Sequence, residues 1–144
     1  MKNIWIALIC ELLLGCADVT KERVPGVYTD FLSMDNDTVW LYENGTYVQK
    51  VYDKNNVLVY CSKGKWEYYV TPFGEESIDV DSLYIGDDDF DLTDPEIRNC
   101  EGTFDGQKYN LLVGFKNDSL YIADPLYIDL PSTWHYFYKV GEIK

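Results

Sequence analysis

The sequence predicts an all-β protein, an antiparallel barrel or sandwich of eight to ten short strands. The chain has 144 residues, 47% of them hydrophobic and 16% aromatic, which is enough apolar material for one core. Runs rich in Tyr, Val, Ile and Trp are separated by turn residues at spacings of about ten residues, as in sandwiches and barrels. No window shows the sustained i, i+3, i+4, i+7 apolar spacing of an amphipathic helix.

The clearest local signal is a hairpin. Asn44-Gly45 separates residues 38–43 from residues 46–52, and both runs are rich in β-branched and aromatic side chains. An Asn-Gly pair between two such runs is typical of a tight β-turn, because both residues tolerate positive φ. Gly26-Val27-Tyr28 is expected to open the strand before this hairpin.

Two further turns are predicted in the middle of the chain. Asp-Lys-Asn-Asn at 53–56 leads into a strand at 57–60. Ser-Lys-Gly at 62–64 leads into another strand at 65–70, which ends before Pro72.

The alternation continues after this point. Residues 77–85 place Ile78 and Val80 on one side of a strand. Residues 107–115 place four side chains on one face at a period of two: Tyr109, Leu111, Val113 and Phe115.

The chain is expected to end in two strands. A turn at 116–118 leads into a strand at 119–122, and the last strand covers 134–140. That strand places four residues on one side: Trp134, Tyr136, Tyr138 and Val140. Residues 94–98 are the one helical candidate, a single turn with Pro95 at its first position.

The first sixteen residues have the layout of a signal peptide. Lys2 precedes an apolar stretch and a small residue before Cys16, and the stretch is shorter than the roughly 20 residues that span a bilayer. The alternative is a buried terminal strand or helix. Leu13-Leu14-Gly15-Cys16 resembles the lipobox of bacterial lipoproteins. The resemblance implies cleavage after Gly15 and lipid attachment to Cys16, and Ala17 then favours the outer membrane.

These observations divide the chain into three parts. Residues 1–15 are the expected signal peptide, residues 16–23 a lipidated polar tether, and residues 24–144 one β domain. The order of the expected hairpins over residues 24–140 looks like that of the small lipocalin-like barrels of bacterial lipoproteins. This resemblance implies an architecture and assigns no function.

Two cysteines remain after the signal peptide and the lipidated thiol are set aside. In an oxidising envelope Cys61 and Cys100 are the expected disulfide, and two buried free thiols are the alternative. Neither residue belongs to a Cys-x-x-Cys pair, so redox catalysis has no motif. One histidine and two distant thiols also make a poor zinc site.

Charge excludes one class of partner. The chain has 25 Asp and Glu against 12 Lys and Arg, a formal net charge of −13, whereas nucleic acid rewards clustered cations. Carboxylates gather at Asp87, Asp89 and Asp91, which match the first ligands of an EF-hand loop. Leu92 and Arg98 stand where that loop needs Gly and Glu, so only a looser calcium site stays open.

Catalytic motifs are missing from the sequence. His135 is the single histidine, and no G-x-S-x-G, Walker or G-x-G-x-x-G motif occurs. We therefore expect a binding protein that needs no cofactor and has no enzymatic activity.

Two kinds of binding protein fit. In the first, a barrel holds a small apolar ligand against aromatic side chains, the candidates being Trp40, Trp66, Tyr109 and Trp134. In the second, Asp87, Asp89 and Asp91 bind a basic protein. Small acidic lipoproteins of this sort resemble inhibitors of basic lysozymes and immunity factors against envelope toxins.

Overall fold

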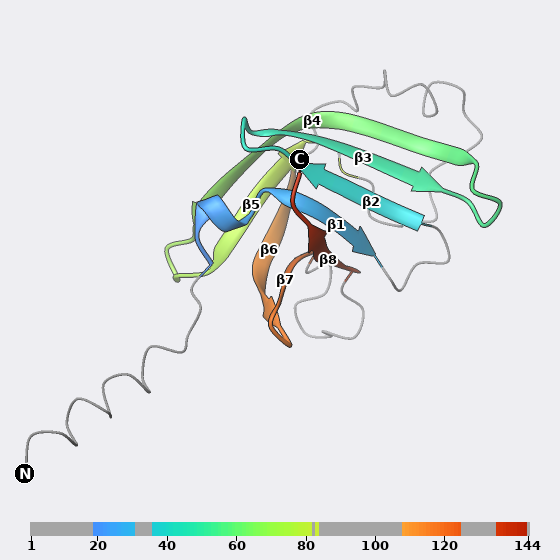
Figure 1. Ribbon diagram of the computed structural model, residues 1–144. Coiled ribbons are helices and arrows are strands. Elements are labelled where there is room, and N and C mark those ends of the chain that lie inside the picture. Colours follow the sequence, from blue (N-terminus) through green and yellow to red (C-terminus); the bar gives the residue numbers. More distant parts are fainter. Residues whose placement is uncertain (1–18, 31–35, 82, 84–107, 125–134, 144) are drawn as a thin grey trace, which may run out of the picture.

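The computed structural model confirms the all-β prediction and decides between its two forms. Eight strands close into an antiparallel barrel (Figure 1). The structure describes residues 19–30, 36–81, 83, 108–124 and 135–143. Strands that follow one another in the sequence are neighbours in the barrel, and the first pairs with the last.

The elements have the following bounds. A 3-10 helix, η1, spans Lys21–Arg23, and the strands are β1 (Gly26–Asp30), β2 (Asn36–Leu41), β3 (Thr46–Tyr52), β4 (Leu58–Val70), β5 (Glu76–Asp81), β6 (Lys108–Lys116), β7 (Ser119–Asp124) and β8 (His135–Gly141). The β2–β3, β4–β5 and β6–β7 turns lie with η1 at one end, which we call the turn end. The other four connections leave from the opposite end, the loop end.

The predicted hairpin turns are confirmed. Gly45 has φ +79°, and the amide of Tyr42 donates to the carbonyl of Thr46 at 2.9 Å. Between β6 and β7, Asn117 and Asp118 both have positive φ, 51° and 61°, as a tight two-residue hairpin turn requires.

The turn between β3 and β4 is also confirmed, and a side chain holds it. Asp53 Oδ1 accepts hydrogen bonds from the amides of Asn55 at 2.8 Å and Val57 at 2.9 Å. These bonds lower the pKa of the Asp53 carboxyl. Aspartate suits this position because its carboxylate can accept hydrogen bonds from nearby backbone amides of the turn.

The predicted turn at residues 62–64 is wrong, because β4 runs without interruption from Leu58 to Val70. Gly64 lies opposite Tyr47 in the β3–β4 register, and a Cβ on Gly64 would come within 2.8 Å of the Tyr47 ring. The glycine makes room for a buried aromatic ring inside a strand, a role that the sequence does not distinguish from a turn.

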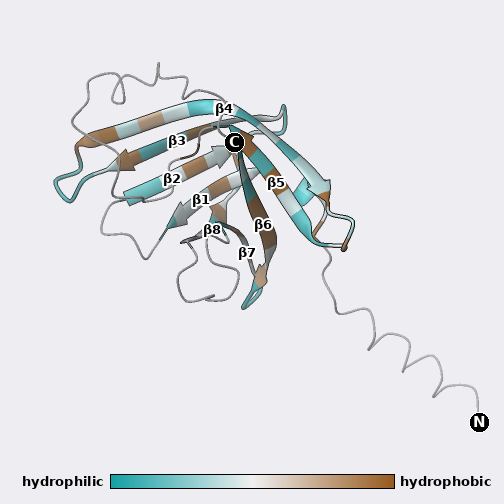
Figure 2. Cartoon of the chain, turned by 180° about the vertical axis from the view of Figure 1, so that it is seen from behind, coloured by the Kyte–Doolittle hydropathy of each residue, from teal (hydrophilic) through white to brown (hydrophobic). Residues whose placement is uncertain are grey.

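The two faces of the sheet follow the predicted alternation (Figure 2). Ile78 and Val80 of β5 face the interior, as do Leu111 and Val113 of β6. The largest interior side chains are almost fully buried: Tyr28, Tyr47, Tyr60, Phe137, Leu41, Ile78, Leu111 and Ile122. Tyr109 and Phe115 are partly buried against the same core.

The barrel takes in part of the predicted tether. Val19 is buried in the core, and η1 follows it directly. The ordered domain therefore includes residues before the expected boundary at residue 24. The predicted signal peptide, Cys16 and the one-turn helix at 94–98 lie outside the described residues.

Candidate functional site

The interior of the barrel is occupied by the chain's own side chains. Tyr28, Tyr47 and Phe137 reach inward from β1, β3 and β8, and none is more than 1% exposed. An eight-stranded barrel is just wide enough for such side chains to fill. The described interior is therefore a packed core.

A chain of hydrogen bonds crosses the interior toward the loop end. Gln49 Nε2 donates to both carboxylate oxygens of Asp37, at 3.0 and 2.9 Å, and Gln49 Oε1 accepts from Ser62 at 3.4 Å. Ser62 Oγ lies 3.4 Å from the hydroxyl of Tyr47, which donates to the backbone carbonyl of Asp81. These buried polar side chains are therefore hydrogen-bonded to one another, as buried polar groups in folded proteins usually are.

Burial also changes the acidity of the interior tyrosines. It raises the pKa of Tyr47 to about 12, and the hydrogen bond with Ser62 opposes the shift. It raises the pKa values of Tyr28 and Tyr60 further, with Glu142 adding to the shift at Tyr28. These hydroxyls stay protonated at neutral pH, and those of Tyr28 and Tyr47 donate hydrogen bonds to the backbone carbonyls of Val24 and Asp81.

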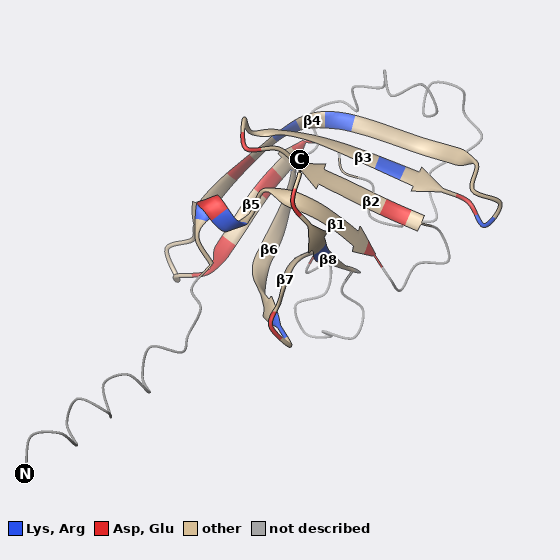
Figure 3. Ribbon diagram, in the orientation of Figure 1, with Lys and Arg blue, Asp and Glu red and all other residues tan. Residues whose placement is uncertain are grey.

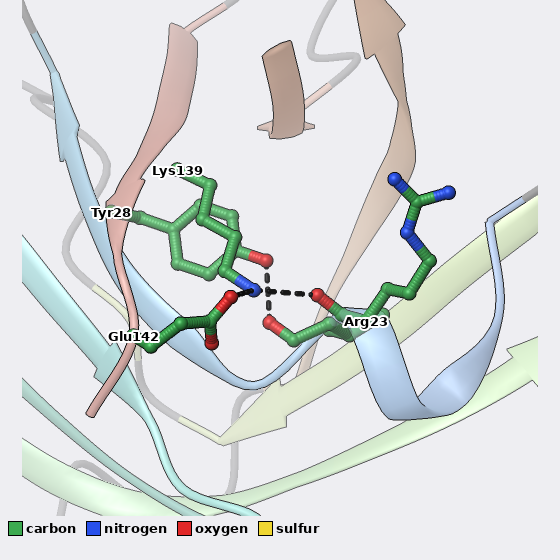
Figure 4. A network of polar contacts seen from close by, with 5 residues as sticks. Arg23, Tyr28, Lys139 and Glu142 are labelled. Atoms are coloured by element: carbon green, nitrogen blue, oxygen red, sulfur yellow. Dashed lines mark hydrogen bonds and ion pairs between the residues drawn. The ribbon is translucent and has the colours of Figure 1, made fainter. Parts of the chain in front are cut away.

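A second polar network fixes η1 across the turn end (Figure 4). The hydroxyl of Tyr28 donates to the carbonyl of Val24, and Lys139 Nζ donates to the carbonyl of Arg23 at 2.9 Å. Lys139 also pairs with Glu142 at 2.7 Å. The Arg23 guanidinium lies 4.6 Å from the centre of the Phe115 ring. These contacts attach the segment before β1 to strands β1, β6 and β8. The segment is thereby held across the turn end of the barrel.

Three tyrosines form a cluster on the outside of the barrel: Tyr121 of β7 and Tyr136 and Tyr138 of β8. The Tyr121 and Tyr136 rings meet edge to face at 5.2 Å, and Tyr136 stacks on Tyr138 at 6.0 Å. Lys116 Nζ lies 4.6 Å from the centre of the Tyr136 ring. Rigid aromatic rings with polar tips suit contact with a partner. We call these three residues the outer tyrosine cluster.

Gly114 supports this cluster, which gives a testable consequence. A Cβ at Gly114 would lie 2.7 Å from the Tyr121 hydroxyl oxygen, so Gly114→Ala must displace the Tyr121 ring. We expect a loss of about 1–2 kcal/mol in the free energy of unfolding and an altered near-ultraviolet circular dichroism spectrum. Gly141→Ala is the control, since its Cβ would meet nothing within 4 Å. Equal behaviour of the two variants would contradict the packing of Tyr121 on Gly114.

The candidate ligand residues from the sequence do not line one pocket. Trp66 is buried in the core and donates from Nε1 to the carbonyl of Tyr42 at 2.9 Å. Trp40 lies on the outer face of β2, with Lys50 Nζ 6.0 Å from its ring centre. Tyr109 packs against the core, and Trp134 lies outside the described residues.

The remaining candidates fall mostly outside the described residues. The residues outside are Asp87, Asp89, Asp91 and Cys100. Cys61 is buried in β4. The disulfide between Cys61 and Cys100 therefore stays a prediction. The backbone of His135 begins β8. Within the described ranges, no three His, Cys, Asp or Glu side chains gather closely enough to hold a metal ion.

Neither the outer tyrosine cluster nor Phe73 is predicted as a site from the sequence. Alternation had placed Tyr136 and Tyr138 on one side of a strand, but their meeting with Tyr121 depends on the β7–β8 pairing. Phe73 is 91% exposed in the β4–β5 turn. The sequence does carry a signal for Phe73: it is a large apolar residue between Pro72 and Gly74, and a turn does not require an apolar residue at that position.

Hollows surround η1 at the turn end. One, of about 260 Å³, is lined by Lys21, Glu22, Pro25, Glu43 and Trp66. Charges of both signs lie side by side on η1, and acidic and basic residues are interspersed over the described strands (Figure 3). The hollow is open and mixed in charge, so it does not define a ligand by its chemistry.

The protein is a small closed β-barrel. In the residues that the structure describes, side chains fill its interior, and the outer tyrosine cluster lies on its wall. No family model, curated protein or solved structure matches the chain. In the part of the chain that the structure describes, no helix is long and apolar enough to cross a membrane.

Proposed function

We propose that this chain is a lipid-anchored binding protein of the bacterial cell envelope, without catalytic activity, that binds its partner on the outside of the barrel. The observation that carries the proposal is the packed interior, because Tyr28, Tyr47 and Phe137 occupy the space that a ligand-holding barrel would leave open. Binding then falls to outer surfaces, of which the outer tyrosine cluster is one.

The lipid anchor is part of this proposal. It is supported by Leu13-Leu14-Gly15-Cys16, and by the position of Val19, which is packed into the core only three residues after Cys16. Three residues span at most about 11 Å, so acyl chains on Cys16 would hold the barrel against the membrane surface. We also propose the outer membrane as the location, and a Cys61–Cys100 disulfide within the domain.

A second candidate, an acidic inhibitor of a basic envelope-active protein, is favoured by the distribution of charge. Residues 82–107 contain eight Asp and Glu against one Arg. This segment leaves β5 after Asp81 and returns to β6 at Lys108, both at the loop end. The high negative charge of this stretch of sequence would steer a basic partner toward it.

The proposal is tested by mass spectrometry on protein purified from its own envelope. The expected denatured mass is that of a chain beginning at Cys16 with acyl chains added. The expected native mass shows no lost small ligand, and a co-purifying protein would identify the partner. An intact Met1 would remove the anchor, and a few hundred daltons lost on denaturation would favour the ligand-holding barrel.

The inhibitor candidate has its own test, with a basic lysozyme as the probe. If Asp87, Asp89 and Asp91 bind it, raising the salt from about 50 to about 300 mM should weaken binding by about tenfold. Replacing these three residues together by Asn should weaken it similarly at low salt.

A matched control removes the same charge at other positions: Glu43, Glu67 and Glu75, all exposed, replaced together by Gln. This variant should bind the probe nearly as well as the parent. Equal losses in the two triple variants would show that net charge alone matters, and binding that is indifferent to salt would exclude this candidate.

A further inference from the structure

We propose that Phe73, at the tip of the β4–β5 turn, inserts into the lipid bilayer beside the anchored N-terminus, so that the barrel stands with its turn end on the membrane. This inference rests on the lipid anchor proposed above. It adds a second contact with the same membrane and a defined orientation of the domain.

The first observation is the exposure of Phe73 on a well-formed turn. Its side chain is 91% exposed, and Val70 at the end of β4 is exposed as well. The Thr71 amide donates to the carbonyl of Glu75 at 2.8 Å, and the Gly74 amide donates to the carbonyl of Thr71 at 2.9 Å. A hydrogen-bonded turn therefore presents a large apolar side chain to the surroundings.

The second observation is the position of this turn next to η1. Both lie at the turn end, and Figure 1 shows η1, the short blue coil, beside the β4–β5 hairpin. The electrostatic surroundings agree: burial raises the pKa of the Tyr68 hydroxyl, and the negative charges of Glu76 in β5 and Glu22 in η1 add to the shift.

Chain length then connects the turn to the membrane. Val19 is fixed in the core, and Cys16 lies within about 11 Å of it in any conformation. A lipidated Cys16 therefore brings the bilayer surface to the turn end, where Phe73 is the most exposed large apolar side chain described. Aromatic side chains are favoured at membrane interfaces, which argues for lipid as the occupant.

The charges around the tip fit a membrane contact of this kind. Lys21 and Arg23 of η1 lie beside Glu22, and Glu75 and Glu76 follow the turn, so neither sign dominates. Phe73 would therefore act through its apolar ring. Since the acyl chains already supply the affinity of the protein for the membrane, the effect of Phe73 is on the orientation of the barrel relative to the bilayer.

The orientation has a consequence for partner binding. With the turn end on the bilayer, the loop end points away from it, and the acidic segment 82–107 begins and ends there. The outer tyrosine cluster lies on the outer wall of the barrel, between its two ends.

The experiment places a reporter at each end of the lipidated protein, reconstituted in phosphatidylcholine vesicles with and without brominated acyl chains. Phe73→Trp is the test variant. Val57→Trp is the matched control, because Val57 is also exposed, at 53%, but lies in the β3–β4 turn at the loop end. The signal of the added tryptophan is obtained by subtracting that of the parent protein.

We expect the Phe73→Trp emission to shift to the blue and to be quenched at least twofold by brominated lipid, with Val57→Trp unchanged. Flotation of each variant with the vesicles reports the anchor separately. Vesicle-bound protein with an unquenched Trp at position 73 would overturn the inference and leave the anchor standing, as would equal quenching at both positions. Protein that carries no acyl chains and does not float would overturn both.

Discussion

Replacement of Phe137 by alanine is expected to lower the free energy of unfolding by about 3–5 kcal/mol, a large part of the stability of a small domain. Phe137 is 1% exposed and lies in β8 opposite Ile122 of β7, facing the core. Deleting its ring leaves a cavity that a closed barrel cannot easily collapse, because hydrogen bonds on both sides of β8 hold the strand. Chemical denaturation measures the loss.

Phe73→Ala is the matched control, since the same atoms are removed from a side chain that nothing covers. Its effect should stay within about 0.5 kcal/mol. If Phe137→Ala fails to fold, Phe137→Leu should still show a loss of about 1 kcal/mol. Equal effects at the two positions would mean that β8 does not direct Phe137 to the interior.

The fold was accessible from the sequence because a period-two alternation and turn residues are local signals. Asn44-Gly45 and the Asn117-Asp118 pair fix hairpins through their own φ angles, and the faces of β5 and β6 follow from Ile78, Val80 and the apolar residues of β6. Barrel closure does not follow from these local signals, since the β1–β8 pairing joins residues more than one hundred positions apart.

The candidate sites were harder to predict, because they depend on which strands are neighbours. The sequence around Gly64 predicts a turn, whereas the β3–β4 register places the Tyr47 ring over this glycine inside a strand. Trp40 and Trp66 look alike in the sequence, yet one lies outside the barrel and the other inside. Alternation gives two faces per strand and leaves open which face meets which residue of a distant strand.

The buried tyrosines lead to the last large effect, a loss of stability in alkaline solution. Burial raises the pKa values of Tyr28, Tyr47 and Tyr60 above 10, their ordinary value, to about 12 for Tyr47. Between pH 10 and pH 12 the unfolded chain therefore releases protons that the native protein keeps. The free energy of unfolding is unaffected by these groups below pH 10 and falls as the pH rises above it.

Each tyrosine should contribute a loss on the order of 1 kcal/mol by pH 11, so the three together should lower the free energy of unfolding by a few kcal/mol. Urea denaturation at pH 9, 10 and 11 measures the fall, and absorbance at 295 nm should show these hydroxyls ionising only as the protein unfolds. The Tyr47→Phe variant measures how much of the fall in the free energy of unfolding comes from a buried tyrosine hydroxyl and how much from other groups. It should be less stable than the parent at pH 7, because the Asp81 carbonyl loses its donor, but its stability should fall less steeply than that of the parent between pH 10 and pH 11. An unchanged slope in Tyr47→Phe would mean that this hydroxyl ionises equally well in the native and unfolded states, and so that the interior around it admits water.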